Sequence, residues 1–404
     1  MTVRVGIVCP NYAAGLYGGV EAVASWLRDA VCAEPGFDAE IISIATSRRD
    51  EVSTRLGSPA TWARRPSSAW HEVGGVPVEH FGCWLAEVEP ARYLPRPALT
   101  RRLRSFDIVQ VVSGTPAFGN VATRAGRPVC LQVATTVESE RRHEAGHRSD
   151  ARPHLIGAVR AAVTSAVARL ERRAVRRADH TFVENEWMLD QVRSLVGDAT
   201  VTLAPPGVDE HRFAPGSVVT GQGYLLTVGR LGSERKNLPG LLRSYAAARR
   251  NGHLSLPMVV AGGGALSPAA ADVMSELGLS EHVRVVADPS ADRLLDLYQG
   301  ASTFVLASHE EGLGVVLLEA QSCGVPIVST STAGAAEVFR RGAIGQLVDT
   351  FQGTSTALGE AMGTWARRGV DPTVQETCRA FATREFGTAV TAGRYLERYR
   401  ALLR

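Results

Sequence analysis

The sequence predicts an α/β fold built from two doubly wound parallel-sheet domains. Short apolar, β-branched runs alternate with longer amphipathic stretches from one end of the chain to the other. These runs are apolar on both faces, which is typical of the covered strands of a parallel sheet. Two Pro/Gly clusters lie near the middle, and 404 residues are too many for one core. We therefore expect two domains of about 200 residues each.

The expected elements follow directly from these runs. In the N-terminal half the expected strands are 3–8, 39–44, 76–81, 108–112, 129–133, 180–183 and 201–203. In the C-terminal half they are 224–228, 258–261, 283–286, 303–306, 326–329 and 346–348. Helical periodicity is clearest at 20–32, 156–178, 238–249, 291–298 and 315–323.

The break between the halves lies where Pro and Gly cluster, because such clusters are typical of linkers. We expect an N-terminal domain at 1–203, a linker at 204–216 and a C-terminal domain at 217–372. The tail, 373–404, is expected to be helical and could cross back to brace the N-terminal domain.

Composition excludes several classes of protein. A net charge of +3 is too balanced for a dedicated nucleic-acid binder, and no apolar run is long enough to span a membrane. The N-terminus lacks the pattern of a secretory signal, so we do not expect secretion. The six cysteines are scattered and form no CxxC pair, so we expect a cytoplasmic protein without a zinc site. The chain has a single lysine, Lys236.

The first chemically informative segment follows the expected strand 303–306. There, a loop containing Gly312, Leu313 and Gly314 opens a helix at Val315. Free backbone N–H groups at a helix start bind anions. Glu311 lies at this start and Glu319 about two turns further on, and carboxylates so placed can accept hydrogen bonds from sugar hydroxyls.

A second segment, 228–237, follows the first strand of the C-terminal half. Arg230 and Lys236 lie six residues apart in this strand-to-helix loop. A fork-shaped guanidinium and a compact ammonium group can converge there on a diphosphate. Open α/β sheets bind ligands at this kind of loop.

Glycine-rich loops follow strands in both halves. Gly18, Gly19 and Glu21 come after the first strand, and Gly263 lies in the loop 261–265. Glycines let the backbone approach a ligand closely. Neither loop has the GxGxxG pattern, which disfavours an NAD-dependent oxidoreductase.

Together these residues resemble the retaining glycosyltransferases of family 4, the "glycosyl transferases group 1" type with the GT-B fold, over nearly the whole chain. Glu311 and Glu319 match the family's EX7E motif, and Arg230 and Lys236 match its GRL…K element. The remaining matches are the GGxE loop at 18–21, the linker pattern PxGVDxxxF at 206–213, the CGxPVV strand at 323–328, and Gly334 and Glu337 of a GGxxE turn.

The resemblance implies two Rossmann-like domains facing across a cleft, with a UDP- or GDP-linked sugar held mainly by the C-terminal domain. Arg230 and Lys236 would neutralise the diphosphate leaving group without a metal. Glu319 would bind the ribose, and Glu311 would contact the donor sugar. A hexosyl group would transfer with retention, by front-face attack through a short-lived oxocarbenium-like species. The chain has no Asp-x-Asp sequence, and we expect no metal and no cofactor beyond the nucleotide-sugar co-substrate.

One departure from the family concerns the N-terminal domain. Family members commonly carry a His after the strand that ends here at residue 133, and this chain has none there. We expect Thr135, Thr136 and Glu138 to contribute to acceptor binding. His143 or His147 could reach the site from the polar loop 138–154. Alternatively, the acceptor needs little help with deprotonation, as a thiol would.

Three interpretations of function remain at this stage. The first is a cytoplasmic glycosyltransferase acting on a small hydrophilic acceptor, in a specialised-metabolite pathway such as antibiotic biosynthesis. The second is a catalytically silent scaffold of the same fold. The third is a membrane-associated glycosyltransferase that acts on a lipid or polysaccharide, with the arginine-rich helix 160–177 contacting the bilayer. We expect His180 and His309 to be structural.

Overall fold

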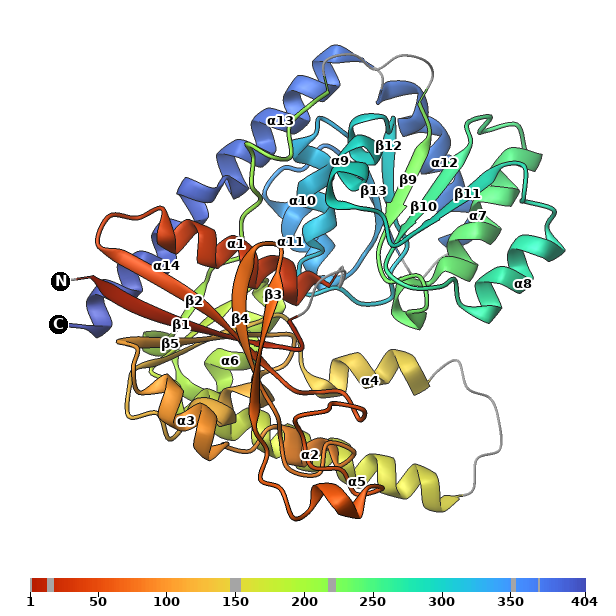
Figure 1. The fold of residues 1–404 in the computed structure, drawn as a ribbon. Coiled ribbons are helices and arrows are strands. Elements are labelled where there is room, and N and C mark those ends of the chain that lie inside the picture. Colours follow the sequence, from red (N-terminus) through yellow and green to blue (C-terminus); the bar gives the residue numbers. More distant parts are fainter. Residues whose placement is uncertain (1, 13–17, 146–153, 217–222, 350–353, 370) are drawn as a thin grey trace. The chain divides into compact units, whose positions relative to one another are not determined.

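The computed structural model describes residues 2–12, 18–145, 154–216, 223–349, 354–369 and 371–404 (Figure 1). The chain divides into two compact units, here called the N-terminal and C-terminal units. The N-terminal unit comprises Met1–Leu16, Val20–Pro205 and Ala392–Arg404, and the C-terminal unit comprises Tyr17–Gly19 and Pro206–Thr391. The main division therefore falls inside the expected linker, between its two adjacent prolines.

An eight-stranded sheet in the order β3-β4-β2-β1-β5-β6-β7-β8 forms the centre of the N-terminal unit. Its strands are β1 (Val3–Pro10), β2 (Phe37–Ile44), β3 (Ser68–Val73), β4 (Val76–Phe81), β5 (Ile108–Ser113), β6 (Val129–Val133), β7 (His180–Val183) and β8 (Val201–Leu203). Its helices are α1 (Gly19–Cys32), α2 (Glu89–Arg92), α3 (Pro97–Leu103), α4 (Val137–Ala145), α5 (His154–Arg177) and α6 (Glu186–Val196). The inner strands β5, β6 and β7 are buried throughout, as their apolar runs predict.

The structure of this unit adds one strand to those expected and contradicts one expected loop. β3 was not expected, and it pairs antiparallel with β4, so the sheet is not wholly parallel. The segment expected to be a polar loop, 138–154, instead contributes α4 and the first residue of α5 in its described part. Glu and Arg, which dominate residues 138–145, are good helix formers, so a polar composition did not require a loop.

The C-terminal unit is built on a parallel sheet of six strands in the order β11-β10-β9-β12-β13-β14. These are β9 (Leu225–Val228), β10 (Met258–Gly262), β11 (Val283–Ala287), β12 (Thr303–Leu306), β13 (Ile327–Thr330) and β14 (Gly345–Val348). The helices are α7 (Leu238–Arg250), α8 (Pro268–Glu276), α9 (Ala291–Gln299), α10 (Val315–Ser322), α11 (Ala333–Arg340), α12 (Thr354–Arg368), α13 (Pro372–Phe386) and α14 (Thr388–Leu402), the last shared with the N-terminal unit.

Both faces of this sheet are covered by helices. Figure 1 shows α7 and α8 on one side and α9 and α10 on the other. The unit has two apolar cores, and successive residues of β9 belong to different ones. Leu225 packs with residues of α7, α8 and α12, whereas Leu226 packs with residues of α9, α10 and α11. This alternation explains why the sequence shows continuous apolar runs rather than an apolar/polar pattern.

The C-terminal tail divides between the units at Ala392. α13 stays with the C-terminal unit, where the Arg379 guanidinium donates to the carbonyl oxygens of Glu210 and Phe213. The end of α14 belongs to the N-terminal unit. There the hydroxyl groups of Tyr395 and Tyr399 donate to Gln132 and Gln110, two buried side chains of β6 and β5. The tail thus satisfies polar groups that would be costly to bury unpaired.

Among the residues that the structure describes, no helix combines the length and apolarity that a bilayer crossing needs.

Candidate functional site

The two loops singled out by the sequence lie next to each other in the C-terminal unit. β9 and β12 are neighbours in the sheet, with Leu226 opposite Phe304. From β9 the chain runs to β10 and β11 on one side, and then returns to add β12 on the other side. Ligands in open α/β sheets bind where the strand order reverses in this way, at the carboxyl ends of the strands. The loops after β9 and β12 meet at this point.

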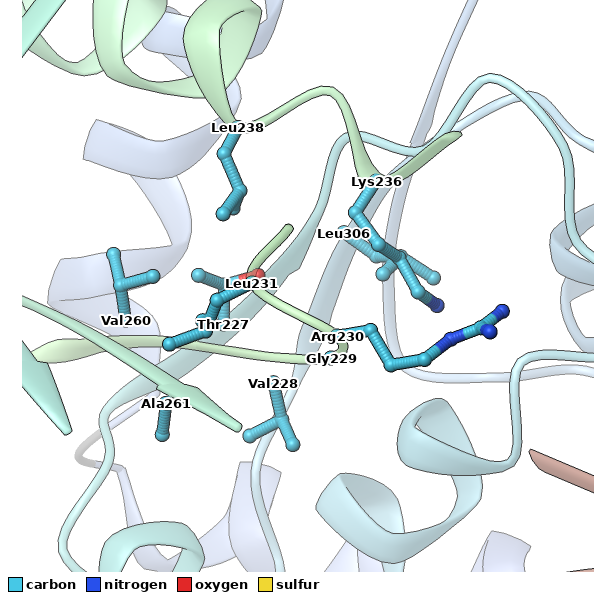
Figure 2. A pocket seen from close by; sticks show the side chains of 10 residues that line it. All are labelled: Thr227, Val228, Gly229, Arg230, Leu231, Lys236, Leu238, Val260, Ala261 and Leu306. Atoms are coloured by element: carbon cyan, nitrogen blue, oxygen red, sulfur yellow. The ribbon is translucent and has the colours of Figure 1, made fainter. Parts of the chain in front are cut away.

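The loop after β9 lines a cavity that contains both predicted cations. Its lining residues are Thr227, Val228, Gly229, Arg230, Leu231, Lys236, Leu238, Val260, Ala261 and Leu306. Figure 2 shows the side chains of Arg230 and Lys236 extending toward the same side, away from the apolar Val260 and Ala261. Arg230 is exposed, and its guanidinium makes no hydrogen bond or ion pair within the described ranges. Its charge is therefore available to an anionic ligand.

Lys236 reaches across to the second loop. Its Nζ lies 2.5 Å from Glu311 Oε1, and the Ser308 hydroxyl donates to the same oxygen at 2.6 Å. Burial alone would raise the pKa of the Glu311 carboxyl, but the Lys236 charge and the hydrogen bonds from Lys236 and Ser308 outweigh burial and lower it. Glu311 is therefore ionised, and an ammonium group with three donors still has capacity for a second acceptor.

A second ion pair, which the sequence analysis missed, lies beside the first. Arg235 Nη1 is 2.8 Å from Glu310 Oε2, and the Glu310 side chain is only 10% exposed. The His309 N–H also donates to the Arg235 carbonyl oxygen at 2.8 Å. The His309 backbone thus helps to join the two loops, and the structural role expected of its side chain stays a prediction. The sequence signal for this pairing was the opposite charge of the two loops, with two adjacent cations at 235–236 and two adjacent carboxylates at 310–311.

Glu319 has a partner that the sequence did not indicate. The Tyr298 hydroxyl, on α9, donates to Glu319 Oε2 at 2.6 Å. Burial raises the pKa of Tyr298 well above its usual value, so the phenol stays protonated as the donor. Burial also raises the pKa of Glu319. The Tyr298 hydrogen bond and the Arg212 charge lower this pKa and partly offset the effect of burial. Glu319 is thus held in a fixed orientation on α10, with one carboxylate oxygen engaged by Tyr298.

The start of α10 has the features expected of an anion site. Gly314 is left-handed at φ +78 and no side chain caps the helix, whose first residue is Val315. Leu313 is buried, whereas Gly312 is only partly so. On the neighbouring loop, the Gly263 carbonyl accepts a hydrogen bond from the Leu231 N–H, which fixes the turn after β9. Donor binding by these residues stays a prediction.

Gly334, at the start of α11, supports the loop that carries Glu311. Its N–H donates to the Glu311 carbonyl oxygen at 3.1 Å. A Cβ atom at this position would lie 2.5 to 2.7 Å from the Leu313 backbone. Glu337, the other residue of this turn, is buried and ion-paired with Arg340 and Arg341, which indicates a structural role.

We therefore expect Gly334→Ala to displace the Glu311 loop. Relieving the overlap should cost about 1 to 3 kcal/mol of unfolding free energy, and misplacement of the loop should lower turnover by roughly 10²-fold. Gly393→Ala is the matched control, because a Cβ on this helical glycine of α14 meets nothing within 4 Å. Denaturant unfolding and initial rates of both variants check this. A Gly334→Ala enzyme as stable and active as Gly393→Ala would contradict it.

The residues predicted near the start of the chain lie at the start of α1. Gly18 immediately precedes this helix, Gly19 begins it and Glu21 lies in its first turn. A Cβ on Gly19 would meet nothing within 4 Å, so this glycine is not required by packing among the described residues. Their assignment to donor binding stays a prediction.

The predicted acceptor residues follow β6 in the N-terminal unit. Thr135 is buried, and its N–H donates to the Gly114 carbonyl oxygen. Thr136 Oγ1 accepts a hydrogen bond from the Ser139 N–H, which places it at the start of α4, and Glu138 is exposed on that helix. His143 belongs to α4, and His147 lies outside the described residues. Thr136 therefore has a local structural role besides any contact with an acceptor.

Glu171, on α5, is a buried carboxyl that the sequence analysis overlooked. Its Oε1 accepts a hydrogen bond from the Val137 N–H at 2.8 Å. Burial raises the pKa of Glu171 to about 8, and the charges of Glu140 and Glu138 add to this effect. A group with such a pKa beside predicted acceptor residues is of functional interest.

Comparison with known proteins supports the family resemblance. The model for "Glycosyltransferase Family 4" matches residues 17–212, and that for "Glycosyl transferases group 1" matches 209–368. A D-inositol 3-phosphate glycosyltransferase from Nocardiopsis dassonvillei is 32% identical over 198 residues, which is 44% of this chain and 46% of that protein. Its counterpart from Mycolicibacterium gilvum is 29% identical over 219 residues, covering 50% and 49%. The chain thus matches about half the length of these curated relatives.

Solved structures share the fold over the whole chain. Sucrose-phosphate synthase from Thermosynechococcus elongatus superimposes with a TM-score of 0.69 at 16% identity, covering 99% of both chains. Anabaena Alr3699/HepE in complex with UDP-glucose gives 0.69 at 15% identity, covering 98% of this chain and 99% of that one. The two family models overlap at residues 209–212, shortly after the main division between the units, and together span residues 17–368. The chain therefore belongs to glycosyltransferase family 4 and has the GT-B fold.

Proposed function

We propose that the enzyme transfers a hexosyl group from a UDP-sugar to a small hydrophilic acceptor, with retention of anomeric configuration and without a metal ion. The observation that carries this proposal is the convergence of two cations, Arg230 and Lys236, with the uncapped start of α10 where the strand order reverses. A nucleoside diphosphate develops negative charge as it departs, and preorganised cations and N–H groups stabilise that charge.

In the proposed step the bond between the sugar C1 and the β-phosphate oxygen breaks, and its electron pair stays on the phosphate. The acceptor oxygen forms its bond to C1 on the same face. Its proton passes to the departing phosphate oxygen, so the step needs no separate base. Lys236 and Arg230 neutralise the phosphate charge, while Glu319 binds the ribose through the carboxylate that Tyr298 orients. Glu311 both holds Lys236 and contacts the donor sugar.

Two comparisons guide the choice of substrates. HepE has been solved with UDP-glucose, which favours UDP over GDP as the donor nucleotide. The curated relatives are named for D-inositol 3-phosphate, so a phosphorylated cyclitol is the first acceptor to try. A role in specialised metabolism and a cytoplasmic location remain predictions.

Titration calorimetry with UDP, GDP, ADP and TDP, with and without EDTA, tests the donor and the metal independence. We expect UDP to bind best and EDTA to have no effect. Incubation of UDP-glucose with D-inositol 3-phosphate, followed by NMR of the anomeric proton, tests the acceptor and the retention. Binding without any transfer would favour the silent scaffold, and transfer only to vesicle-bound lipid would favour the membrane-associated alternative. Preferred binding of another nucleotide or an inverted product would contradict the proposal.

A further inference from the structure

Two ion pairs and a backbone hydrogen bond join the loop after β9 to the loop after β12. The outer contact is the ion pair between Arg235 Nη1 and Glu310 Oε2, at 2.8 Å. Next to it, the His309 N–H donates to the Arg235 carbonyl oxygen, also at 2.8 Å. The inner contact is the ion pair between Lys236 Nζ and Glu311 Oε1, at 2.5 Å. Consecutive residues of one loop thus pair with consecutive residues of the other.

A bound donor diphosphate would weaken one of the two ion pairs and leave the other intact. Lys236 lines the cavity together with Arg230, so a diphosphate bound there competes with Glu311 for the ammonium group. Arg235 is not among the residues that line that cavity, and the Glu310 side chain paired with it is nearly buried. The outer pair can therefore persist while the inner pair loosens. Such a pair stabilises the contact between the two loops more than an exposed pair would, because one partner is shielded from water.

We propose that Arg235 and Glu310 form a positioning pair, which keeps Lys236 and Glu311 in register when the donor diphosphate binds. This inference rests on the proposed function, since it assigns the pair a role in the same donor site. The pair acts through Lys236 and Glu311 rather than on the donor. Without it, the link from the β9 loop to the β12 loop depends on the His309 backbone contact and on an inner pair that the diphosphate weakens.

The variants Arg235→Ala and Glu310→Gln test this role. We expect each to lower kcat about 10- to 100-fold, because small displacements of reacting groups have effects of that size. KM for the donor should change less than 5-fold. The charge-reversed double variant, Arg235→Glu with Glu310→Arg, should recover much of the loss. Arg243→Ala is the matched control, because Arg243 forms an exposed pair with Glu276 in the same unit and should leave kcat unchanged.

A pH profile separates positioning from a general loss of stability. The charged groups near the Glu311 carboxylate are Lys236 and Arg235 from the β9 loop and Glu310 from its own loop, with the Ser308 hydroxyl donating to it. Arg235 is one of the charges that lower the pKa of Glu311, so its removal should move the acid limb of kcat to higher pH. Arg235→Lys should restore the wild-type limb.

A readout independent of catalysis distinguishes failure of this inference from failure of the proposed function. Because Lys236 is the only lysine, growth on ¹³C-labelled lysine gives one Cε signal, and that signal reports on the ammonium group. We expect Arg235→Ala to shift this signal and Arg243→Ala to leave it in place. An unshifted signal with wild-type kcat in Arg235→Ala would overturn the inference. If the signal shifts in Arg235→Ala but the protein binds no nucleotide, Arg235 does position Lys236, and the proposed donor site is wrong.

Discussion

Lys236→Ala is expected to reduce kcat by about 10²- to 10³-fold, the range found when one preorganised donor to a developing charge is removed. Lys236 lies 2.5 Å from Glu311 and faces the cavity beside Arg230, so alanine removes a cation from the leaving group and a partner from Glu311. KM should rise less than kcat falls, because the diphosphate gains its full charge only as it departs.

Two companion variants make this prediction specific. Lys236→Arg keeps the positive charge but not the compact ammonium group, so an intermediate loss is expected. Arg243→Ala removes an exposed cation of the same unit and should behave as wild type. Initial rates at saturating donor, with unfolding curves for each variant, check these expectations. A Lys236→Ala enzyme within about 3-fold of wild type would contradict the assigned role.

Glu319→Ala is expected to weaken UDP binding by about 10- to 100-fold, since a hydrogen bond to a charged group contributes about 1.5 to 3 kcal/mol. The loss should be confined to the ribose. Wild type should bind UDP more tightly than 2′-deoxyuridine diphosphate, whereas Glu319→Ala should bind both alike. Calorimetry with the two nucleotides measures this difference directly.

Tyr298→Phe tests the contact between Glu319 and the ribose indirectly, through the residue that orients Glu319. It removes the 2.6 Å hydrogen bond that orients Glu319 and should reduce discrimination between ribose and deoxyribose only in part. Tyr245→Phe is the matched control, because Tyr245 is an equally buried tyrosine of the same unit whose hydroxyl donates to the Leu256 carbonyl oxygen instead. If Glu319→Ala still bound UDP more tightly than 2′-deoxyuridine diphosphate, to the same degree as wild type, the ribose would not bind at Glu319.

Most of the fold could be predicted because a covered parallel sheet leaves a strong sequence signal. Strands such as β5, β6 and β12 are short apolar runs with every residue buried. β3 was missed because it is mostly exposed and includes His71 and Glu72. The Gly74-Gly75 dipeptide between β3 and β4, with both residues at positive φ, was the available sign of a tight hairpin.

The site could be predicted only in part for a different reason. Lys236 and Glu311 stand in short motifs next to strand ends, so their sequence neighbours indicate their place. Tyr298 lies on another helix, 21 residues before Glu319, and nothing in its neighbourhood marks it. The pairing of Arg235 with Glu310 spans 75 residues and depends on the order of strands in the sheet. Contacts of this kind require the fold.

The most direct test of the account uses the single lysine. The ¹³Cε signal of Lys236 is followed while UDP, and separately uridine, is added to wild-type enzyme. If the ammonium group binds the diphosphate, UDP shifts the signal to saturation and uridine leaves it nearly unchanged. If UDP binds by calorimetry without moving the signal, the diphosphate lies elsewhere and the central role assigned to Lys236 is wrong.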